Sequence, residues 1–364
     1  MSRYKGTTNF SHDMPDCTGV LLCNLGTPEA PTASAVRRYL GEFLSDPRVV
    51  EVPRLVWKLI LHGIILRTRP RRVARAYAKV WTDAGSPLLA ISRQQEAALK
   101  EHLAGELGTD VPVALGMCYG KPSMAEALEE LRQAGVRRLL ILPLYPQYAS
   151  ATTGAVFDAV MHELGRWRWL PELRMVNHYH DEPAYIDALA GSVQAYWAEH
   201  GRSSKRLMMS FHGLPKASLE TGDPYFCECQ KTGRLLAEKL GLADEEWKLT
   251  FQSRFGLAEW LQHYTDETLE TWARAGIDTV DTVCPGFAAD CLEALEEMAI
   301  QNRELFLEHG GTEYRYIPAL NDSTAHIEAL STVVHRHIQG WPLAVEAGER
   351  AARQQRAQSL GAVK

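Results

Sequence analysis

The stretch LMMSFHGLP, residues 207–215, joins a continuous apolar run to a single histidine and a sharp Gly-Leu-Pro break. An apolar run without polar alternation is typical of a strand buried on both faces, as in a parallel sheet. In open parallel sheets, ligands bind beyond the carboxyl ends of the strands. The stretch therefore predicts an α/β fold in which His212 stands at a strand end, beside a binding site.

Similar apolar runs recur along the chain, separated by segments with helical periodicity. They are GVLLCNLG (19–26), VPVALGM (111–117), RRLLILPLYP (137–146), KRLMMSFHG (205–213), DTVDTVCPG (278–286) and YRYIPALND (314–322). Segments 123–134 and 221–240 are predicted to be helices, the second ending at Gly241, a C-cap residue. We expect IEALSTVVHRHI (327–338) to be a helix that packs back on the first half of the chain. The polar end, 348–364, is predicted to be a solvated, partly frayed tail.

The length predicts two domains, because 364 residues exceed the usual range of a single hydrophobic core. The runs fall into one set before about residue 147 and another between 172 and 319. We therefore expect an N-terminal domain over 1–147, joined by the C-terminal segment 320–364, and a second domain over 148–319. Each is expected to have a parallel sheet flanked by helices, with the active-site cleft between the two.

Composition narrows the class of protein. The formal net charge of −6 gives no basic footprint for nucleic acid. The polar N-terminus lacks the apolar stretch of a secretion signal, and seven scattered cysteines fit a reducing compartment, so we expect a cytoplasmic protein. The longest apolar run, 55–66, is shorter than the roughly 20 residues that cross a bilayer.

Two constellations offer titratable chemistry. His212 is either a core histidine bonded to a backbone carbonyl or a proton acceptor and metal ligand at a strand end. In PGFAADCLEALEEM (285–298), Asp290 and Glu293 have the spacing of a capping box, which would be a purely structural role. Glu293 and Glu297 lie four residues apart on one helix face, where a cation or a proton would relieve their repulsion.

Three other segments leave alternatives open. The loop LPLYPQYASATTG (142–154) places Tyr145 either in the core or at a pocket wall. Segment 49–77 is either an amphipathic helix packed on the core, with a solvated arginine face, or a lip for an apolar ligand or a membrane surface. Cys227 and Cys229 lack a second cysteine pair at zinc-site spacing. Gly26-Thr27-Pro28 lacks a dinucleotide or Walker fingerprint, which argues against a nucleotide site.

Taken together, these motifs resemble the ferrochelatase family over nearly the whole chain. The shared stretches are LLCNLGTPEAP, FLSDPRVVEVP, AGSPL, YPQYASATTG, SFHGLP, GDPY, TFQSRFG, YTDETL, GFAADCLEALEE and IPALND. The resemblance implies a chelatase-like fold of two Rossmann-like domains around a porphyrin cleft. It also implies insertion of ferrous iron into protoporphyrin IX, the last step of haem biosynthesis, giving haem b with release of two protons.

The resemblance assigns roles to individual residues. His212 and Glu293 match the catalytic pair that faces across the site, as metal ligands and proton acceptors. Asp290, Glu297 and Tyr145 match the path for protons or metal. The residues expected to bind porphyrin are Leu25, Tyr77, Ser86, Tyr119 and Trp260.

Departures from the family pattern set further expectations. Cys118 stands where many relatives have an arginine, so any role of that position is open. Ser150 replaces a ligand of the iron–sulfur cluster found in human-type relatives, and no cysteine follows Cys291. We therefore expect no cluster and no resident cofactor, with Fe²⁺ as a substrate.

The expected partners are protoporphyrin IX and Fe²⁺. The arginines at 67–72 are compatible with weak peripheral contact with anionic lipid, or with the preceding oxidase of the haem pathway. Two rival functions are a cobalt or nickel chelatase for another tetrapyrrole and a non-catalytic porphyrin carrier. The choice between protoporphyrin and coproporphyrin and the oligomeric state stay open.

Overall fold

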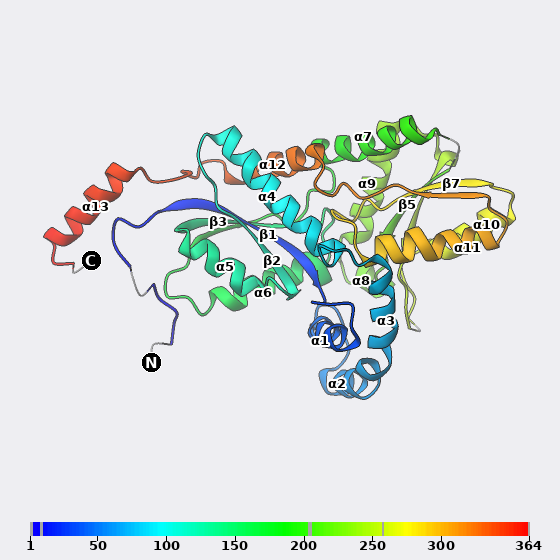
Figure 1. Ribbon diagram of the computed structural model, residues 1–364, viewed down its shortest axis with the longest axis horizontal. Helices are drawn as coiled ribbons and strands as arrows, with labels where there is room; N and C mark the ends of the chain where they lie inside the picture. Colours follow the sequence, from blue (N-terminus) through cyan, green and yellow to red (C-terminus); the bar gives the residue numbers. More distant parts are fainter. Residues whose placement is uncertain (1–2, 8–9, 203–205, 257, 363–364) are drawn as a thin grey trace.

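A computed structural model describes residues 3–7, 10–202, 206–256 and 258–362. Two four-stranded parallel sheets form its framework (Figure 1). The N-terminal sheet has the order β2-β1-β3-β4 and the C-terminal sheet the order β6-β5-β7-β8. The strands are β1 (Cys17–Thr27), β2 (Val113–Gly120), β3 (Val136–Pro143), β4 (Glu172–Met175), β5 (Leu207–His212), β6 (Trp247–Gln252), β7 (Thr279–Val283) and β8 (Glu313–Tyr316).

The predicted α/β class is confirmed, since each predicted run contains one of these strands. Lys205, the first residue of the run before His212, lies outside the described residues. Strands β4 and β6 were not predicted. Because β4 pairs with β3, the N-terminal sheet continues beyond residue 147. The proposed domain boundary there stays a prediction.

Helices cover both faces of the two sheets. Those around the N-terminal sheet are α4 (Pro87–Leu107), α5 (Met124–Gln133), the short π-helix η2 (Ser150–Gly154) and α6 (Ala155–Leu164). Those around the C-terminal sheet are α7 (Pro183–His200), α8 (Lys216–Glu220), α9 (Tyr225–Leu240), the 3₁₀ turn η3 (Asp244–Glu246), α10 (Thr265–Arg274), the π-helix η4 (Glu293–Asn302) and α11 (Arg303–Glu308). As predicted, α9 ends at Gly241, which is left-handed with φ +67°.

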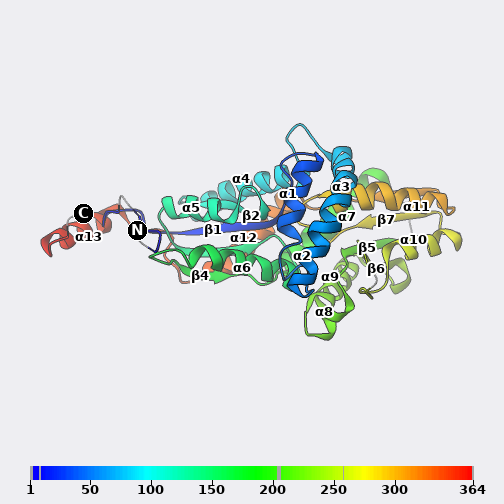
Figure 2. The ribbon, with the colours of Figure 1, turned by 90° about the horizontal axis from the view of Figure 1, so that it is seen from below.

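Three further elements lie near the junction of the two sheets (Figure 2) and project from the body (Figure 1). They are α1 (Ala33–Phe43), α2 (Arg54–Ile60) with the π-helical turn η1 (Leu61–Ile65), and α3 (Leu66–Val80). We call α2, η1 and α3 the lip. Within the described residues, no helix is both long and apolar enough to span a bilayer.

Helix α12 (Thr324–Ile338) returns to the N-terminal sheet, as the sequence predicts. It contacts α4, β3 and β4 as well as α7, and its Leu330 and Val334 share one buried apolar cluster with Leu99 and Leu103 of α4. The expectation of a frayed tail after residue 348 is wrong in part. Residues 347–359 form α13 (Ala347–Ser359), an exposed helix whose Arg353 donates to the backbone of the N-terminal segment.

The end of β1 approaches β2 so closely that only glycine fits. Gly26 has φ +104°, and a Cβ there would lie 1.7 Å from the carbonyl oxygen of Tyr119. Glycine adopts this left-handed conformation without steric cost. Gly26 therefore lets β1 pack closely on β2 at the carboxyl ends of the strands, where ligands are expected.

Candidate active site

His212 is the last residue of β5, where it is half-buried. Its Nδ1 lies 2.7 Å from the carbonyl oxygen of Gly213. A carbonyl can only accept a hydrogen bond, so Nδ1 carries the proton and donates it. The Nε2 of the neutral ring is therefore left unprotonated, and its lone pair can accept a proton or bind a metal ion.

The backbone around His212 is fixed from two sides. Gly213 donates its N–H to Gln252 O at 2.8 Å, and a Cβ on Gly213 would lie only 2.8 Å from that oxygen. On the other side, the Tyr225 hydroxyl donates to His212 O at 2.9 Å. The chain thus holds the imidazole by its backbone and leaves Nε2 free for chemistry.

Trp260 lies beside this turn. It is buried, its indole N–H donates to Phe255 O at 2.9 Å, and its ring would lie 3.2 Å from a Cβ on Gly213. The structure thus places Trp260 next to the His212 turn. Its expected contact with porphyrin stays a prediction.

Glu297 connects the π-helix η4 to the His212 side of the site. Its carboxylate accepts the Ser253 N–H at 2.8 Å and also the Ser253 hydroxyl. Burial raises the pKa of Glu297 above its ordinary value, and the charge of Glu293 adds to the rise. The Ser253 hydrogen bond opposes the rise, as does the positive charge that His212 carries when it is protonated. Glu297 is therefore close enough to interact electrostatically with both His212 and Glu293. The pairing of His212 with Glu293 across the site stays a prediction.

Glu293 opens η4 and faces elements of the N-terminal half. Burial raises the pKa of Tyr39 and of Tyr77, and the Glu293 charge raises both pKa values further. Burial also raises the pKa of Cys291, and the charge of Glu293 raises it further. The acidic helix therefore presents Glu293 toward the tyrosines of α1 and α3, and Glu297 toward His212.

Asp290 does not form the capping box that its spacing with Glu293 suggested. Its carboxylate accepts the Tyr316 hydroxyl at 2.7 Å, the Ala319 N–H at 3.2 Å and the Asn321 amide at 2.9 Å. Within the ranges that the structure describes, no side chain caps η4, whose preceding residue is Leu292. The capping-box interpretation is wrong because Asp290 turns to the segment after β8.

Tyr145 follows β3 and is half-buried. Within the part of the chain that the structure describes, its hydroxyl oxygen is buried with no hydrogen-bond partner. Burial raises the pKa of Tyr145, so the phenol stays protonated. A buried donor with no partner is costly, and it is available to a ligand.

Three of the expected porphyrin residues gather at the end of β1. Thr27 donates its hydroxyl to Ser86 Oγ at 2.8 Å, and Thr27 is near enough to Tyr77 to lower the pKa of its phenol against the rise caused by burial. Leu25 is half-buried and packs on the cluster that contains Tyr77 and also on the one that contains Ala294 of η4. These three side chains therefore lie on the side of the site that Glu293 faces.

Tyr119, the remaining member of that set, anchors the loop before the lip. It is buried at the end of β2, and its hydroxyl donates to Asp46 Oδ2 at 2.9 Å. Asp46 also accepts the Arg48 N–H at 2.8 Å. The structure gives Tyr119 a positioning contact, and its porphyrin contact stays a prediction.

The lip departs from the ordinary interpretation of residues 49–77. Helix α3 does pack on the core, through residues that include Leu66 and Tyr77. Helix α2 buries none of its residues, and Leu55 and Leu59 are 83% and 77% exposed. The alternative, an apolar lip, describes α2 better.

A charge pair joins the lip to the acidic helix. Lys79 of α3 lies 2.8 Å from Glu296 of η4, and Glu296 also accepts the Gln301 amide at 2.6 Å. Glu296 thus ties η4 to α3 of the lip.

Sequence reasoning missed three residues that shape the site. Ser253 holds Glu297 with φ +67°, Tyr39 lies near Glu293, and Asp46 anchors Tyr119. Ser253 lies in TFQSRFG, directly after β6, so recognising β6 would have placed it at a strand end beside His212. Nothing in the local sequence marks Tyr39.

The fold and site define a two-domain α/β protein of the chelatase class. A solved structure of SirB from Bacillus subtilis with Fe³⁺ is similar over 88% of this chain and 96% of that chain, with a TM-score of 0.52 and 12% identity. At that identity the likeness shows the fold alone.

Sequence comparison identifies the family. The ferrochelatase family model matches residues 17–338. Ferrochelatases from Nitrosococcus oceani and Thioalkalivibrio sulfidiphilus are 58% and 55% identical, each over 99% of this chain and over 99% and 98% of their own lengths. The chain belongs to the ferrochelatase family, and its reaction is the insertion of iron into protoporphyrin in haem synthesis.

Proposed function

We propose that His212 and Glu293 carry this reaction from opposite sides of a protoporphyrin IX bound between the two sheets. The observation that supports the proposal is the convergence of His212, Glu293 and Glu297, drawn from β5 and η4. Iron enters as Fe²⁺ and the product is haem b, the end of the pathway. Two pyrrole protons are released for each iron bound.

The reaction demands a bent macrocycle, because a planar ring shields its nitrogens from iron and from a base. Binding energy spent on bending the ring favours the transition state over the free substrate. The residues proposed to hold the bent macrocycle are Tyr77, Ser86 and Leu25 on one side. On the other side is the turn at His212, whose backbone is fixed by hydrogen bonds.

The protons leave through His212. A pyrrole N–H gives its proton to Nε2, which becomes an N–H, and the imidazolium passes the proton on before the second transfer. Glu297 is the next acceptor, because its raised pKa lets it hold a proton that an exposed glutamate would lose. Glu293 is the carboxylate that meets the incoming metal.

Asp290 and Tyr145 complete the proposed path. Both Asp290 oxygens already accept hydrogen bonds, so we infer that Asp290 chiefly ties η4 to residues 316–321. Tyr145 has a free donor that can bond to the substrate. In this proposal, neither Asp290 nor Tyr145 abstracts a pyrrole proton.

No resident cofactor enters this proposal. Ser150 stands at the position expected for a cluster ligand. Its hydroxyl accepts a hydrogen bond from Arg48 Nη1 at 3.1 Å, and its backbone N–H donates to Asp223 Oδ2 at 2.7 Å. These contacts support a cluster-free form of the enzyme, in which iron is only a substrate.

The lip supports a weak peripheral membrane contact. Leu55, Leu59 and Ile64 are exposed apolar residues, and the basic segment 67–72 follows them. Apolar residues with a cationic flank suit an anionic lipid surface, from which an apolar porphyrin could enter. A cytoplasmic location, supported by seven free cysteines, and transfer from the preceding oxidase belong to the same proposal.

The test is iron insertion by His212→Ala under anaerobic conditions with protoporphyrin and Fe²⁺. Turnover should fall by about 10²- to 10⁴-fold, the usual contribution of a general base, while porphyrin affinity stays within a few-fold. His309→Ala is the control, because His309 also donates Nδ1–H to a backbone carbonyl, that of Leu305, at 2.8 Å.

Glu293→Gln should slow turnover in the same assay, whereas Glu296→Gln should not. Undiminished insertion by His212→Ala would refute the assignment of His212. Formation of no more than one haem per chain by the unmodified protein would instead indicate a carrier.

A further inference from the structure

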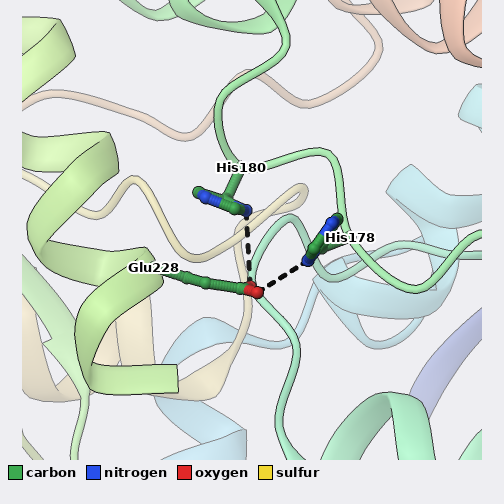
Figure 3. A group of neighbouring side chains, drawn as sticks. All are labelled: His178, His180 and Glu228. Carbon is green, nitrogen blue, oxygen red and sulfur yellow. Dashed lines mark hydrogen bonds and ion pairs between the residues drawn. The ribbon is translucent and has the colours of Figure 1, made fainter. Parts of the chain in front are cut away.

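His178, His180 and Glu228, none of which is assigned a part in iron insertion, converge on one another (Figure 3). His178 Nδ1 lies 2.6 Å from Glu228 Oε1, and His180 Nδ1 lies 3.4 Å from Glu228 Oε2. One ligand atom from each residue lies within 4.8 Å of the others. Among the described residues, no other group of three histidine, cysteine or carboxylate side chains lies close enough together to hold one metal ion.

His180 gives the second, independent sign of a ligand. Its side chain is buried, only 6% exposed, and within the described ranges its Nδ1 has no hydrogen-bond partner, because the 3.4 Å approach to Glu228 lacks hydrogen-bond geometry. The Thr232 hydroxyl fixes the residue by donating to His180 O at 2.9 Å. A buried imidazole nitrogen is thus held pointing toward a carboxylate without a bond to it.

Glu228 is fixed in the same way. Its Oε2 accepts the Tyr148 N–H at 2.7 Å, so the carboxylate is oriented independently of the histidines. Ligands held by such outer hydrogen bonds are typical of built metal sites. His178 is exposed and leaves one side open to water.

We propose that His178, His180 and Glu228 bind one divalent transition-metal ion of the zinc class. Two imidazole nitrogens and one carboxylate are the ligand set of open zinc and ferrous sites, and Mg²⁺ prefers oxygen ligands alone. Ligands about 2 Å from a tetrahedral ion lie roughly 3 Å apart. The three ligand atoms lie within 4.8 Å of one another, so they must draw together by up to about 2 Å around the ion, and water completes the coordination.

The ion would fasten the segment between β4 and α7 to helix α9. His178 and His180 lie in the crossover between β4 of the N-terminal sheet and α7, while Glu228 lies on α9. Three residues before Glu228 on α9, Tyr225 donates to His212 O. The site therefore supports stability and the placement of His212, without taking part in the chemistry.

The test uses His212→Ala protein, in which the active site has lost its histidine, after removal of metal with a chelator. Zn²⁺ should bind with one equivalent per chain and raise the unfolding temperature, as a ligand of the folded state must. Mg²⁺ at the same concentration should do neither. Co²⁺ in place of Zn²⁺ should give the visible absorption of a nitrogen- and oxygen-ligated ion.

Adding His178→Ala should weaken Zn²⁺ binding by about 100-fold or more, since even outer-shell partners of a metal are worth about 10- to 100-fold. Glu228→Gln should do the same while keeping an acceptor for the Tyr148 N–H. His335→Ala is the matched control, because His335 and His102 bond to different oxygens of Glu106 in a second His–Glu–His group.

The proposal is overturned if the His212→Ala protein binds no Zn²⁺, or if His178→Ala and Glu228→Gln leave the affinity unchanged. Equal loss in His335→Ala would also overturn it. None of these results bears on iron insertion by the unmodified chain, so the inference and the role of His212 fail separately.

Discussion

A single backbone carbonyl decides what the His212 ring can do. Because Gly213 O accepts from Nδ1, the basic nitrogen is Nε2, and its direction is set by the turn. The sequence places His212 at a strand end, since the apolar run before it is unambiguous. It cannot give the tautomer, which depends on a contact between neighbouring backbone and ring atoms.

Glu297 supplies a pH-dependent term in stability. Its folded-state pKa is raised above the ordinary 4.5, so the folded protein binds more protons than the unfolded chain between the two values. The contribution is full below about pH 4.5 and is lost as the pH rises through the raised pKa.

Glu297→Gln should therefore gain stability relative to the unmodified protein as the pH rises from 4.5 toward neutral. Denaturant unfolding at a series of pH values measures the difference between the two proteins. Glu308→Gln, at an exposed position, should show no such trend. A difference of the opposite slope would mean that the Ser253 bonds outweigh burial.

At the scale of elements, η4 shows where periodicity stops being informative. Helical structure after Pro285 is predictable from the spacing of apolar residues. The π-helical bonding over Glu293–Asn302 is not, because it depends on i to i+5 hydrogen bonds that the spacing of side chains does not encode. The capping box predicted for Asp290 was wrong for a related reason. Its partners Tyr316 and Asn321 lie at the end of β8 and after it, far from Asp290 in the sequence.

Helix α2 should account for binding to anionic vesicles. The double change Leu55→Ser and Leu59→Ser should weaken binding at least about tenfold, because burying one leucine is worth about 1.5–3 kcal/mol. Unfolding stability should hardly change, since α2 buries no residue. Vesicle sedimentation measures the affinity.

Leu360→Ser is the control for that experiment, because Leu360 is 87% exposed but lies near the C-terminal end of the described chain. If this variant weakens vesicle binding as much as the lip variant, the contact is nonspecific. If neither does, the lip serves the porphyrin alone.

At the scale of the whole molecule, the apolar runs predicted the two parallel sheets, but they did not predict β4 and β6. Strand β4 reads ELRM and β6 reads WKLTFQ, so neither has the continuous apolar run that marks a doubly buried strand. Both are edge strands. The edge position alone does not explain the miss, since β2 and β8 are also edge strands and were predicted; the short or interrupted apolar runs of β4 and β6 do.

Both sheets should unfold together. One buried apolar cluster includes Leu140 and Leu142 of the N-terminal sheet together with Met209 and Phe211 of the C-terminal sheet. Calorimetry should therefore show one transition. Two resolved transitions would mean that the halves are independent.

Gln147 joins the halves by hydrogen bonds. It is buried, and its amide donates to Thr232 Oγ1 at 3.0 Å and to Pro285 O at 3.5 Å. Gln147→Ala should lower the free energy of unfolding by about 1–3 kcal/mol, the cost of buried groups left unpaired. Gln133→Ala, at an exposed site on α5, is the control for denaturant unfolding. An equal effect of both changes would contradict a bridging role.

The return of α12 to the N-terminal sheet has a consequence during synthesis. Strands β1 to β4 have left the ribosome by residue 175, but α12, which packs on β3, β4 and α4, ends only at residue 338. At about 5–20 residues per second, the nascent chain displays a bare apolar face for on the order of 10 s. Chaperones that meet emerging polypeptides have that interval in which to act.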